Sequence, residues 1–341
     1  MDRRQFLAGA VALPTTASLD GLDSIAPTTP PTRVGATEIA RIRDTAAGVK
    51  RGDLRWGGGF GFDAALVETR RARELLEARC PERLRGDLLV GVGWLASNAG
   101  FMAFDIERYR DAARLWNVAQ RCADEAVNWS LQARVLGSMA RQSIWLDHPA
   151  DGVALLDRAL MDERGELVPT EHAMLWALKS RAHADLGDAT AAETAVGTAD
   201  EWLAQTVPGE CDDRPWVAHY SQAHHWGDTG VAWERLAVSG HGPQAVANAD
   251  GRYRGAADGH GTDAARSHVL TLVSLARLNT VAGDLDVGVA VGHQALDASE
   301  QVRSARVRED LVGLYEATAA HATRGDVGDL RDQIATTLLA A

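Results

Sequence analysis

The sequence has few cysteines and no long apolar segment, and each absence excludes a class of protein. Its 341 residues include three cysteines, Cys80, Cys122 and Cys211, an odd number without the close pair spacing of a zinc motif. They predict neither a disulfide framework nor a zinc site, and a reducing, cytoplasmic compartment suits them best. No stretch approaches the roughly 20 apolar residues of a spanning helix, so we expect no membrane association.

Positive charge is also in short supply. The 35 Lys and Arg residues are outnumbered by 47 Asp and Glu residues, which gives a formal net charge of −12. Such a surface repels a phosphate backbone, so we expect no direct nucleic-acid binding by this chain. The hydrophobic content of 46% and the charged content of 24% together indicate a soluble protein with a substantial core.

Motifs of familiar catalytic and cofactor sites are missing. Neither Gly-x-Ser-x-Gly nor His-Glu-x-x-His occurs, and Trp56-Gly57-Gly58-Gly59 lacks the Gly-Lys-Ser/Thr ending of a phosphate loop. We interpret this glycine run as a flexible connection after the first helix. The spacings of His219, His224 and His225 differ from the three or four residues that place two ligands on one helix face. We therefore predict a protein that is not an enzyme and has no cofactor or metal.

Residues 1–36 differ in composition from the rest of the chain. Met1-Asp2-Arg3-Arg4-Gln5-Phe6-Leu7 and the apolar run after it are similar to a twin-arginine export signal. The apolar run is short, no Ala-x-Ala cleavage pattern follows, and residues 14–36 have the Pro, Thr, Ser and Gly content of a linker. We expect residues 1–36 to be a disordered N-terminal segment, with export by the twin-arginine pathway as the alternative.

From residue 37 onward, one position recurs at an interval near 40 residues. Gly187, Gly240, Gly283 and Gly325 precede four of its occurrences by four or five residues, where glycine can close a helix. The stretches between have a helical period and no alternating strand pattern. These features predict one all-α domain over 37–341, a tetratricopeptide-like α-α superhelix (solenoid) of about seven degenerate helix pairs. The recurring positions are Ala65, Ala112, Gly152, Ala192, Ala245, Gly288 and Leu330, at spacings of 47, 40, 40, 53, 43 and 42.

The interval of 53 residues between Ala192 and Ala245 is longer than the others. The excess is long enough for an additional helix, which we place from Pro215 to Trp226. In this interpretation Trp216, Tyr220 and Trp226 pack on neighbouring helices.

The chain resembles the C-terminal regions of actinobacterial transcriptional regulators that join a lambda-repressor-like helix-turn-helix to a tetratricopeptide domain. The resemblance is carried by Asp2-Arg3-Arg4-Gln5-Phe6-Leu7-Ala8-Gly9-Ala10, by Trp56-Gly57-Gly58-Gly59 and by the degenerate repeats with Leu186-Gly187-Asp188-Ala189. In such proteins the Arg-Arg-x-Phe-Leu segment follows the DNA-binding domain. No helix-turn-helix is found in this sequence, so the resemblance implies a sensor module, and an upstream DNA-binding domain stays an open question.

Tetratricopeptide arrays bind through the first helix of each pair, and the register predicts which side chains line that surface. It places Arg134 at position 2 of its unit, and Arg141, Arg181 and Arg277 at position 9 of theirs. Guanidinium groups are suited to bidentate capture of carboxylates. The aromatic groove positions are Trp94, Phe101, Phe104 and Trp145, with Ile144 beside them.

Two interpretations of these residues stay open. In the first, the chain is a regulatory module that binds a peptide or a partner protein in its concave groove, with a homodimer as a further option. In the second, the arginines pair with acids of the neighbouring helix and the aromatic side chains belong to the core between repeats.

Overall fold

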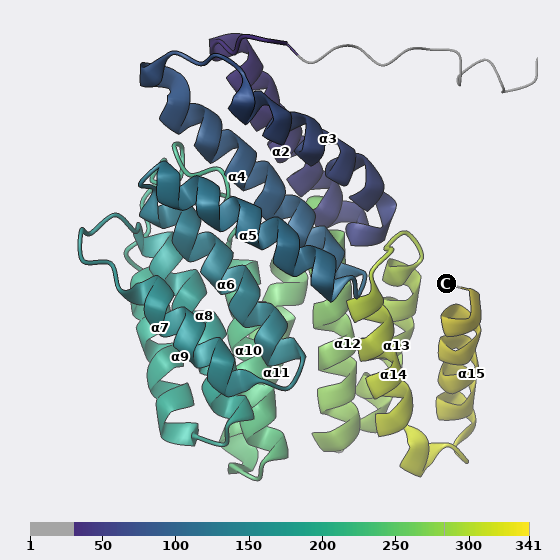
Figure 1. The fold of residues 1–341 in the computed structure, drawn as a ribbon. Helices are drawn as coiled ribbons and strands as arrows, with labels where there is room; N and C mark the ends of the chain where they lie inside the picture. The colour runs from purple at the N-terminus through teal and green to yellow at the C-terminus, as the bar shows by residue number, and fades with distance from the viewer. Residues whose placement is uncertain (1–30, 283, 341) are drawn as a thin grey trace, which may run out of the picture.

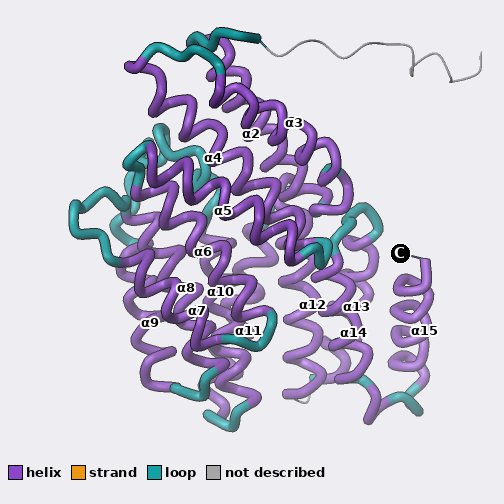
Figure 2. The backbone as a smooth tube through the Cα atoms, in the orientation of Figure 1, coloured by secondary structure: helices purple, strands orange, loops and turns teal. Residues whose placement is uncertain are grey.

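The computed structural model describes residues 31–282 and 284–340 (Figure 1), and the regular structure within them is helical (Figure 2). Fourteen α-helices follow one another in this part of the chain, joined by short loops and 3-10 turns. The described residues contain no strand, only one isolated bridge between Arg33 and Arg79. The prediction of an all-α protein is confirmed.

The helices are short and similar in length. They are α2 (Ala36–Trp56), α3 (Phe62–Glu74), α4 (Glu82–Asp105), α5 (Tyr109–Glu125), α6 (Trp129–Trp145), α7 (Pro149–Leu160), α8 (Pro169–Asp185), α9 (Ala189–Leu203), α10 (Gln222–Val238), α11 (Gly242–Gly259), α12 (Ala265–Ala282), α13 (Leu285–Ser299), α14 (Ala305–Ala317) and α15 (Gly325–Ala340).

Neighbouring helices pack as hairpins. The closest packing joins α4 to α5, α6 to α7, α8 to α9, α10 to α11 and α12 to α13. The even-numbered helices also contact one another in series from α2 to α14 and so form a continuous row. Each hairpin therefore buries its apolar face against the next one, as expected of an array in which a single hairpin cannot form a core.

The recurring positions found in the sequence are all buried, and five of them lie on the second helix of one of these hairpins: Ala112, Gly152, Ala192, Ala245 and Gly288. Two of them have no room for a larger side chain. A Cβ atom on Gly152 would lie 2.6 Å from Ile144 Cγ1, and one on Gly288 would lie 2.6 Å from Thr280 Oγ1. Small residues at these places allow the two helices of the hairpin to approach closely.

The turns follow the sequence prediction in part. Gly187 and Gly240 have φ values of +75° and +87°, the left-handed conformation that glycine adopts without strain. Gly325 instead begins α15, and Gly283 lies outside the described residues. In the earlier hairpins the left-handed turn position is taken by residues other than glycine, such as Glu107 and Asp147.

The additional helix expected from Pro215 to Trp226 is not present. Residues 204–221 form an irregular loop, and α10 begins at Gln222, where the Ser221 side chain accepts a hydrogen bond from the backbone N–H of His224. The loop is held by a buried aromatic anchor, since Trp216 Nε1 donates to Ser130 Oγ at 3.0 Å. This long-range anchor holds the segment before α10 in turns.

A late helix of the even-numbered row packs against the first helix of that row. Helix α2 packs against α12, and the loop after α2 lies on the segment that precedes α14. Gly59 N donates to Arg303 O at 2.9 Å, and Arg303 N donates to Trp56 O at 2.7 Å. A Cβ atom on Gly57 would lie 2.5 Å from Arg303 O. The glycine run is thus a packed contact between distant parts of the chain, and the prediction of a flexible connection is wrong.

Most of the predicted segment 1–36, including the twin-arginine-like start, lies outside the described residues. Of its described part, Val34 is 3% exposed and its N–H donates to Arg79 O at 2.9 Å, while Arg79 N donates to Thr32 O at 3.1 Å. Packed structure therefore begins a few residues before position 37.

Helix α4 is central to the fold and correspondingly apolar. Among the described helices it alone is long and apolar enough to span a membrane by length and composition, and 89% of its apolar window is buried inside the protein. It packs against α2, α3, α5 and α6. Its composition is that of a core helix.

Candidate functional site

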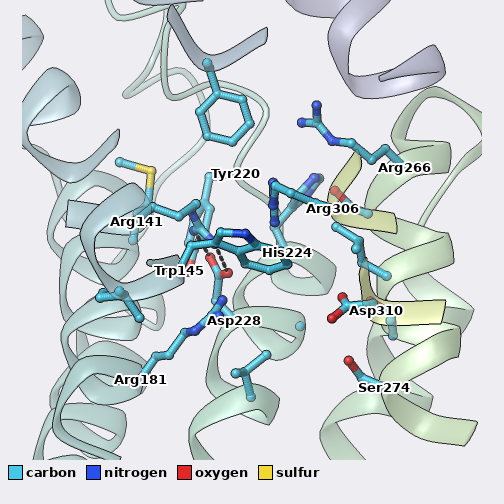
Figure 3. Close-up of a pocket in the computed structure, with 18 of the residues that line it drawn as sticks. Arg141, Trp145, Arg181, Tyr220, His224, Asp228, Arg266, Ser274, Arg306 and Asp310 are labelled. Carbon is cyan, nitrogen blue, oxygen red and sulfur yellow. Dashed lines mark hydrogen bonds and ion pairs between the residues drawn. The ribbon is translucent and has the colours of Figure 1, made fainter. Parts of the chain in front are cut away.

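The row of even-numbered helices surrounds a cavity of about 370 Å³, here called the central cavity. Each helix of the row contributes to its lining, and the loop before α10 adds His219 and Tyr220. Figure 3 shows Arg266 and Arg306 on one side of the cavity, Arg141 and Arg181 on the other, and Trp145 between them. The lining is rich in charged and aromatic side chains.

The structure brings six of the eight predicted site residues together in this cavity: Arg134, Arg141, Arg181, Arg277, Phe101 and Trp145 all line it, together with Ile144. The three arginines expected at position 9 lie at the same place in α6, α8 and α12, twelve residues after the first residue of each helix.

Trp94 and Phe104 do not line the cavity, and their prediction as groove residues is corrected. Trp94 is 3% exposed and Phe104 is fully buried, both within the hydrophobic core. Phe104 packs against Phe101 and Trp116, with ring centroids 5.6 Å and 6.3 Å away. Both residues lie on α4, whose central place in the fold buries nearly its whole second half.

Two of the predicted arginines are neutralised by acids of neighbouring helices. Arg141 on α6 forms a bidentate pair with Asp228 on α10, with both N–O distances at 2.8 Å. Arg277 Nε on α12 donates to Glu234 Oε1 at 2.8 Å and lies near Asp310 on α14. These two arginines fit the interpretation in which the charged side chains connect the helices, and we call these contacts the paired wall.

Arg181 and Arg134 are held differently. Arg181 lies 3.9 Å from Asp185, outside hydrogen-bond distance, and its guanidinium lies over the Trp145 ring at 5.8 Å. Arg134 has no acid partner within ion-pair distance among the described residues, although it is only 7% exposed. Burial lowers the pKa of both arginines, that of Arg134 to about 10.

The sequence analysis missed Arg235, on α10, and three further cations of the cavity: Lys50, Arg266 and Arg306. These three lie on α2, α12 and α14, which meet only because the row returns to its beginning. Together with Arg134 they surround the ring of Phe101, and we call these five residues the Phe101 cluster. The sequence contains a pattern that could have found Arg266 and Arg306. Each is the second residue of its helix, so the two occupy the same position in the repeat.

Acidic side chains also reach the cavity. Burial raises the pKa of Asp185, of Glu309 and of Asp310, because each carboxylate loses hydration that its arginine neighbours replace only in part. Asp310 lies one turn beyond Arg306 on α14, and Figure 3 places it away from Arg266. Asp185 lies 3.1 Å from Arg235, and Asp310 lies 3.6 Å from Arg277, so acidic and basic groups lie side by side on this part of the wall.

The histidines near the central cavity either have a lowered pKa or face away from the cavity. Burial, with a smaller effect of His260, lowers the pKa of His224 to about 3, and burial lowers that of His260 to about 4. His225 is fully buried and its Nε2 lies 2.6 Å from Asp200 Oδ1, away from the central cavity. Over residues 31–282 and 284–340, no group of three His, Cys, Asp or Glu side chains is placed to hold a metal ion.

A scan against models of protein families finds no match to this sequence, and a search of curated proteins finds no significant relative.

Proposed function

We propose that the chain is a non-catalytic sensor module, a tetratricopeptide-like superhelix that binds a short peptide in its central cavity. The observation that carries the proposal is the convergence of charged and aromatic side chains from the first helix of each hairpin on the central cavity. In tetratricopeptide arrays this is the concave, ligand-binding surface.

The size of the cavity favours a peptide over a folded partner. A volume of about 370 Å³ lies at the small end of the range of pockets that bury small ligands. The packing of α2 on α12 brings the beginning of the row against its later part, beside the cavity. Of the two partners expected from the sequence, the short peptide is therefore the one we propose.

The chemistry of the lining also suits a peptide. Trp145 and Phe101 offer flat apolar surfaces, and Ser267, Thr271 and Ser274 on α12 offer hydroxyl groups for backbone amides. Arg134, which has no acid partner among the described residues, matches the negative charge of a peptide with a free C-terminus. Asp228 is occupied by Arg141, and the low pKa of His224 makes its imidazole a weak base, which supports binding rather than proton transfer.

A regulatory role follows from the position of α2. This helix contributes Lys50 and Leu54 to the cavity and Asp53 to a buried ion pair with Arg266 on α12. A ligand that touches Lys50 would tighten the attachment of α2 to the rest of the array and change the exposure of its backbone. We expect hydrogen exchange of α2 to slow when ligand binds.

The experiment that tests peptide binding fills the cavity without changing its charge. A Cβ atom on Gly227 would lie 3.5 Å from Thr271 Oγ1 and 4.0 Å from His260 Nε2, so Gly227→Met adds a side chain inside the cavity. Gly251→Met is the matched control, because Gly251 lies within α11 and has open space at its Cβ position. Both changes replace glycine in a helix and favour helix formation.

The wild-type protein and both variants are incubated with a pool of random hexapeptides that have free termini, and retained peptides are identified by mass spectrometry. We expect the wild type and Gly251→Met to retain the same peptides and Gly227→Met to retain none above background. Retention of the same peptides by Gly227→Met, or no enrichment by any protein, would show that the central cavity is not a peptide site.

A further inference from the structure

The chain has two lysines, and one of them, Lys50 on α2, is buried beside the central cavity. Its side chain lines the cavity, and Nζ lies 5.2 Å from the centroid of the Phe101 ring. Asp53 lies 3.6 Å from Nζ, which is longer than a hydrogen bond, and both carboxylate oxygens of Asp53 accept from Arg266. The amine therefore faces the cavity without a strong anionic partner.

The charged side chains around this ring do not balance. The group consists of Lys50, Arg134, Arg266 and Arg306, with Asp53 and Asp105 as its acids. Arg266 lies closest to the acids, since it pairs with Asp53 and lies 3.4 Å from Asp105. Even with Lys50 uncharged, three positive charges face two negative ones. One further negative charge would make the group neutral.

The surplus charge is located at Arg134. This residue is 7% exposed, its Nε is buried without a hydrogen-bond partner, and within residues 31–282 and 284–340 its side chain forms no ion pair. Burial lowers its pKa to about 10, and the neighbouring Arg141 adds to the effect. A guanidinium group donates best to the two oxygens of a carboxylate. An anion formed next to Arg134 would therefore find donors that have no other partner.

The amine of Lys50 is a nucleophile at neutral pH. Burial lowers its pKa to about 7 against the smaller raising effect of Asp53, and Arg134 adds to the lowering. His219 and His224, in the loop before α10 and on α10, add no positive charge there, because burial holds the pKa of both well below the ordinary value. A desolvated lysine beside a cation keeps its nitrogen lone pair available for attack on an electrophile.

We propose that Lys50 is a site of reversible carbamate formation with carbon dioxide, and that Arg134 binds the carbamate. The nitrogen lone pair forms a bond to the carbon of CO₂, one C–O double bond opens to give a carboxylate oxygen, and a proton of the amine passes to solvent. The side chain of Lys50 thereby becomes negative and balances the surplus charge around Phe101. Arg266 is a positioning residue, because Asp53 and Asp105 already engage it.

The carbamate has a structural consequence. It would add a direct link between α2, which carries Lys50, and α6, which carries Arg134. Carbon dioxide would therefore stabilise the attachment of α2 to the array. Because Arg134 can serve one anion at a time, the modification would oppose binding of a peptide carboxylate. The inference goes beyond peptide binding and does not depend on it, since the reaction needs no peptide.

The test traps the carbamate in the intact protein. Wild-type protein is equilibrated at pH 8 with or without carbon dioxide and bicarbonate at constant ionic strength. It is then treated with a trialkyloxonium salt, which converts a carbamate into a stable ester, and the modified peptides are identified by mass spectrometry. Lys179 is the control within the same molecule, because it pairs with Asp157 at 2.6 Å and does not line the cavity.

We expect the ester on Lys50 to depend on carbon dioxide and to exceed that on Lys179 by at least about tenfold. With ¹³C-bicarbonate, NMR should show a carbamate signal that disappears on degassing and is absent from Lys50→Arg, which keeps the charge but has no primary amine. The thermal unfolding midpoint of the wild type should rise with carbon dioxide at constant pH, and that of Lys50→Arg should not.

Arg134→Gln tests the proposed carbamate ligand. It should raise the carbon dioxide pressure for half-modification of Lys50 by at least about tenfold, the contribution of a charge-assisted hydrogen bond. Arg254→Gln on the exposed face of α11 is the matched control and should leave that pressure unchanged.

Two results from the wild type alone would overturn the inference: no ester on Lys50 that depends on carbon dioxide, or equal modification of Lys50 and Lys179. Unchanged modification in Arg134→Gln would remove Arg134 as the group that binds the carbamate. Circular dichroism of each variant checks that its helices are intact.

Discussion

The paired wall and the Phe101 cluster of the central cavity use the same residue type in opposite ways. On the paired wall, Arg141 is matched by Asp228 with two hydrogen bonds, and Arg277 is matched by Glu234. In the Phe101 cluster, Arg134 and Arg306 are only 7% and 6% exposed, and neither forms a hydrogen-bonded ion pair. The comparison teaches that burial of an arginine does not reveal its role: the matched arginines join helices, and the unmatched ones keep donors without a partner.

The largest effect is expected at Asp53, the acid that compensates the Phe101 cluster. Asp53→Asn removes the charge that faces Arg266 and Lys50, and leaves both cations buried without it. We expect a loss of about 3–5 kcal/mol in the free energy of unfolding, the usual result of breaking a buried pair from one side. Urea denaturation at pH 7 measures it. Asp44→Asn, on an exposed turn of α2, serves as control and should change little.

A smaller loss is expected on the paired wall. Arg141→Met keeps the length of the side chain and removes the partner of Asp228, whose carboxylate is 18% exposed. We expect the free energy of unfolding to fall by about 2–4 kcal/mol, less than for Asp53 because some water reaches the pair. The same urea titrations give the value, and a stability equal to wild type would mean that this pair does not hold α6 to α10.

Acidification adds positive charge to a cavity that already has a surplus. The folded-state pKa values of His224 and His260 lie near 3 and 4, below the ordinary value of 6.5, so the unfolded chain takes up these protons first. Stability is complete above pH 6.5 and falls as the pH decreases toward 4, by at most about 1.4 kcal/mol per pH unit for each histidine. His224→Gln should reduce this slope in denaturation series between pH 7 and 4.

The smallest effect on stability is expected at Arg134, although it lies on the same helix as Arg141. Arg134→Met removes a buried cation that faces other cations and no acid of its own. We expect the free energy of unfolding without ligand to stay within about 0.5 kcal/mol of wild type or to rise. A loss as large as that of Arg141→Met would assign Arg134 to the structure and not to the ligand.

The sequence was informative wherever the fold depends on contacts between neighbouring hairpins. Small residues such as Gly152 and Gly288 marked the second helix of each hairpin correctly, because close helix crossings exclude larger side chains at fixed intervals. The same register placed Arg141, Arg181 and Arg277 in one row, and they line one cavity.

The sequence was uninformative about contacts that depend on the curvature of the whole array. Lys50 and Arg306 meet because small rotations between successive hairpins add up until the row closes, and no local pattern encodes that sum. Burial of Phe104 also followed from the central place of α4 and not from its repeat position. The helix expected at Pro215 was wrong because Trp216 is held by a hydrogen bond to Ser130, which lies 86 residues away along the chain.

The hydrogen bonds between the Gly57–Gly59 loop and Arg303 have a consequence for synthesis of the protein. The hairpins can form one after another as the chain leaves the ribosome, since each needs only its predecessor. The Phe101 cluster has no such early stage, because Arg306 arrives some 250 residues after Lys50. A nascent or truncated chain can therefore be largely helical and still lack this part of the central cavity.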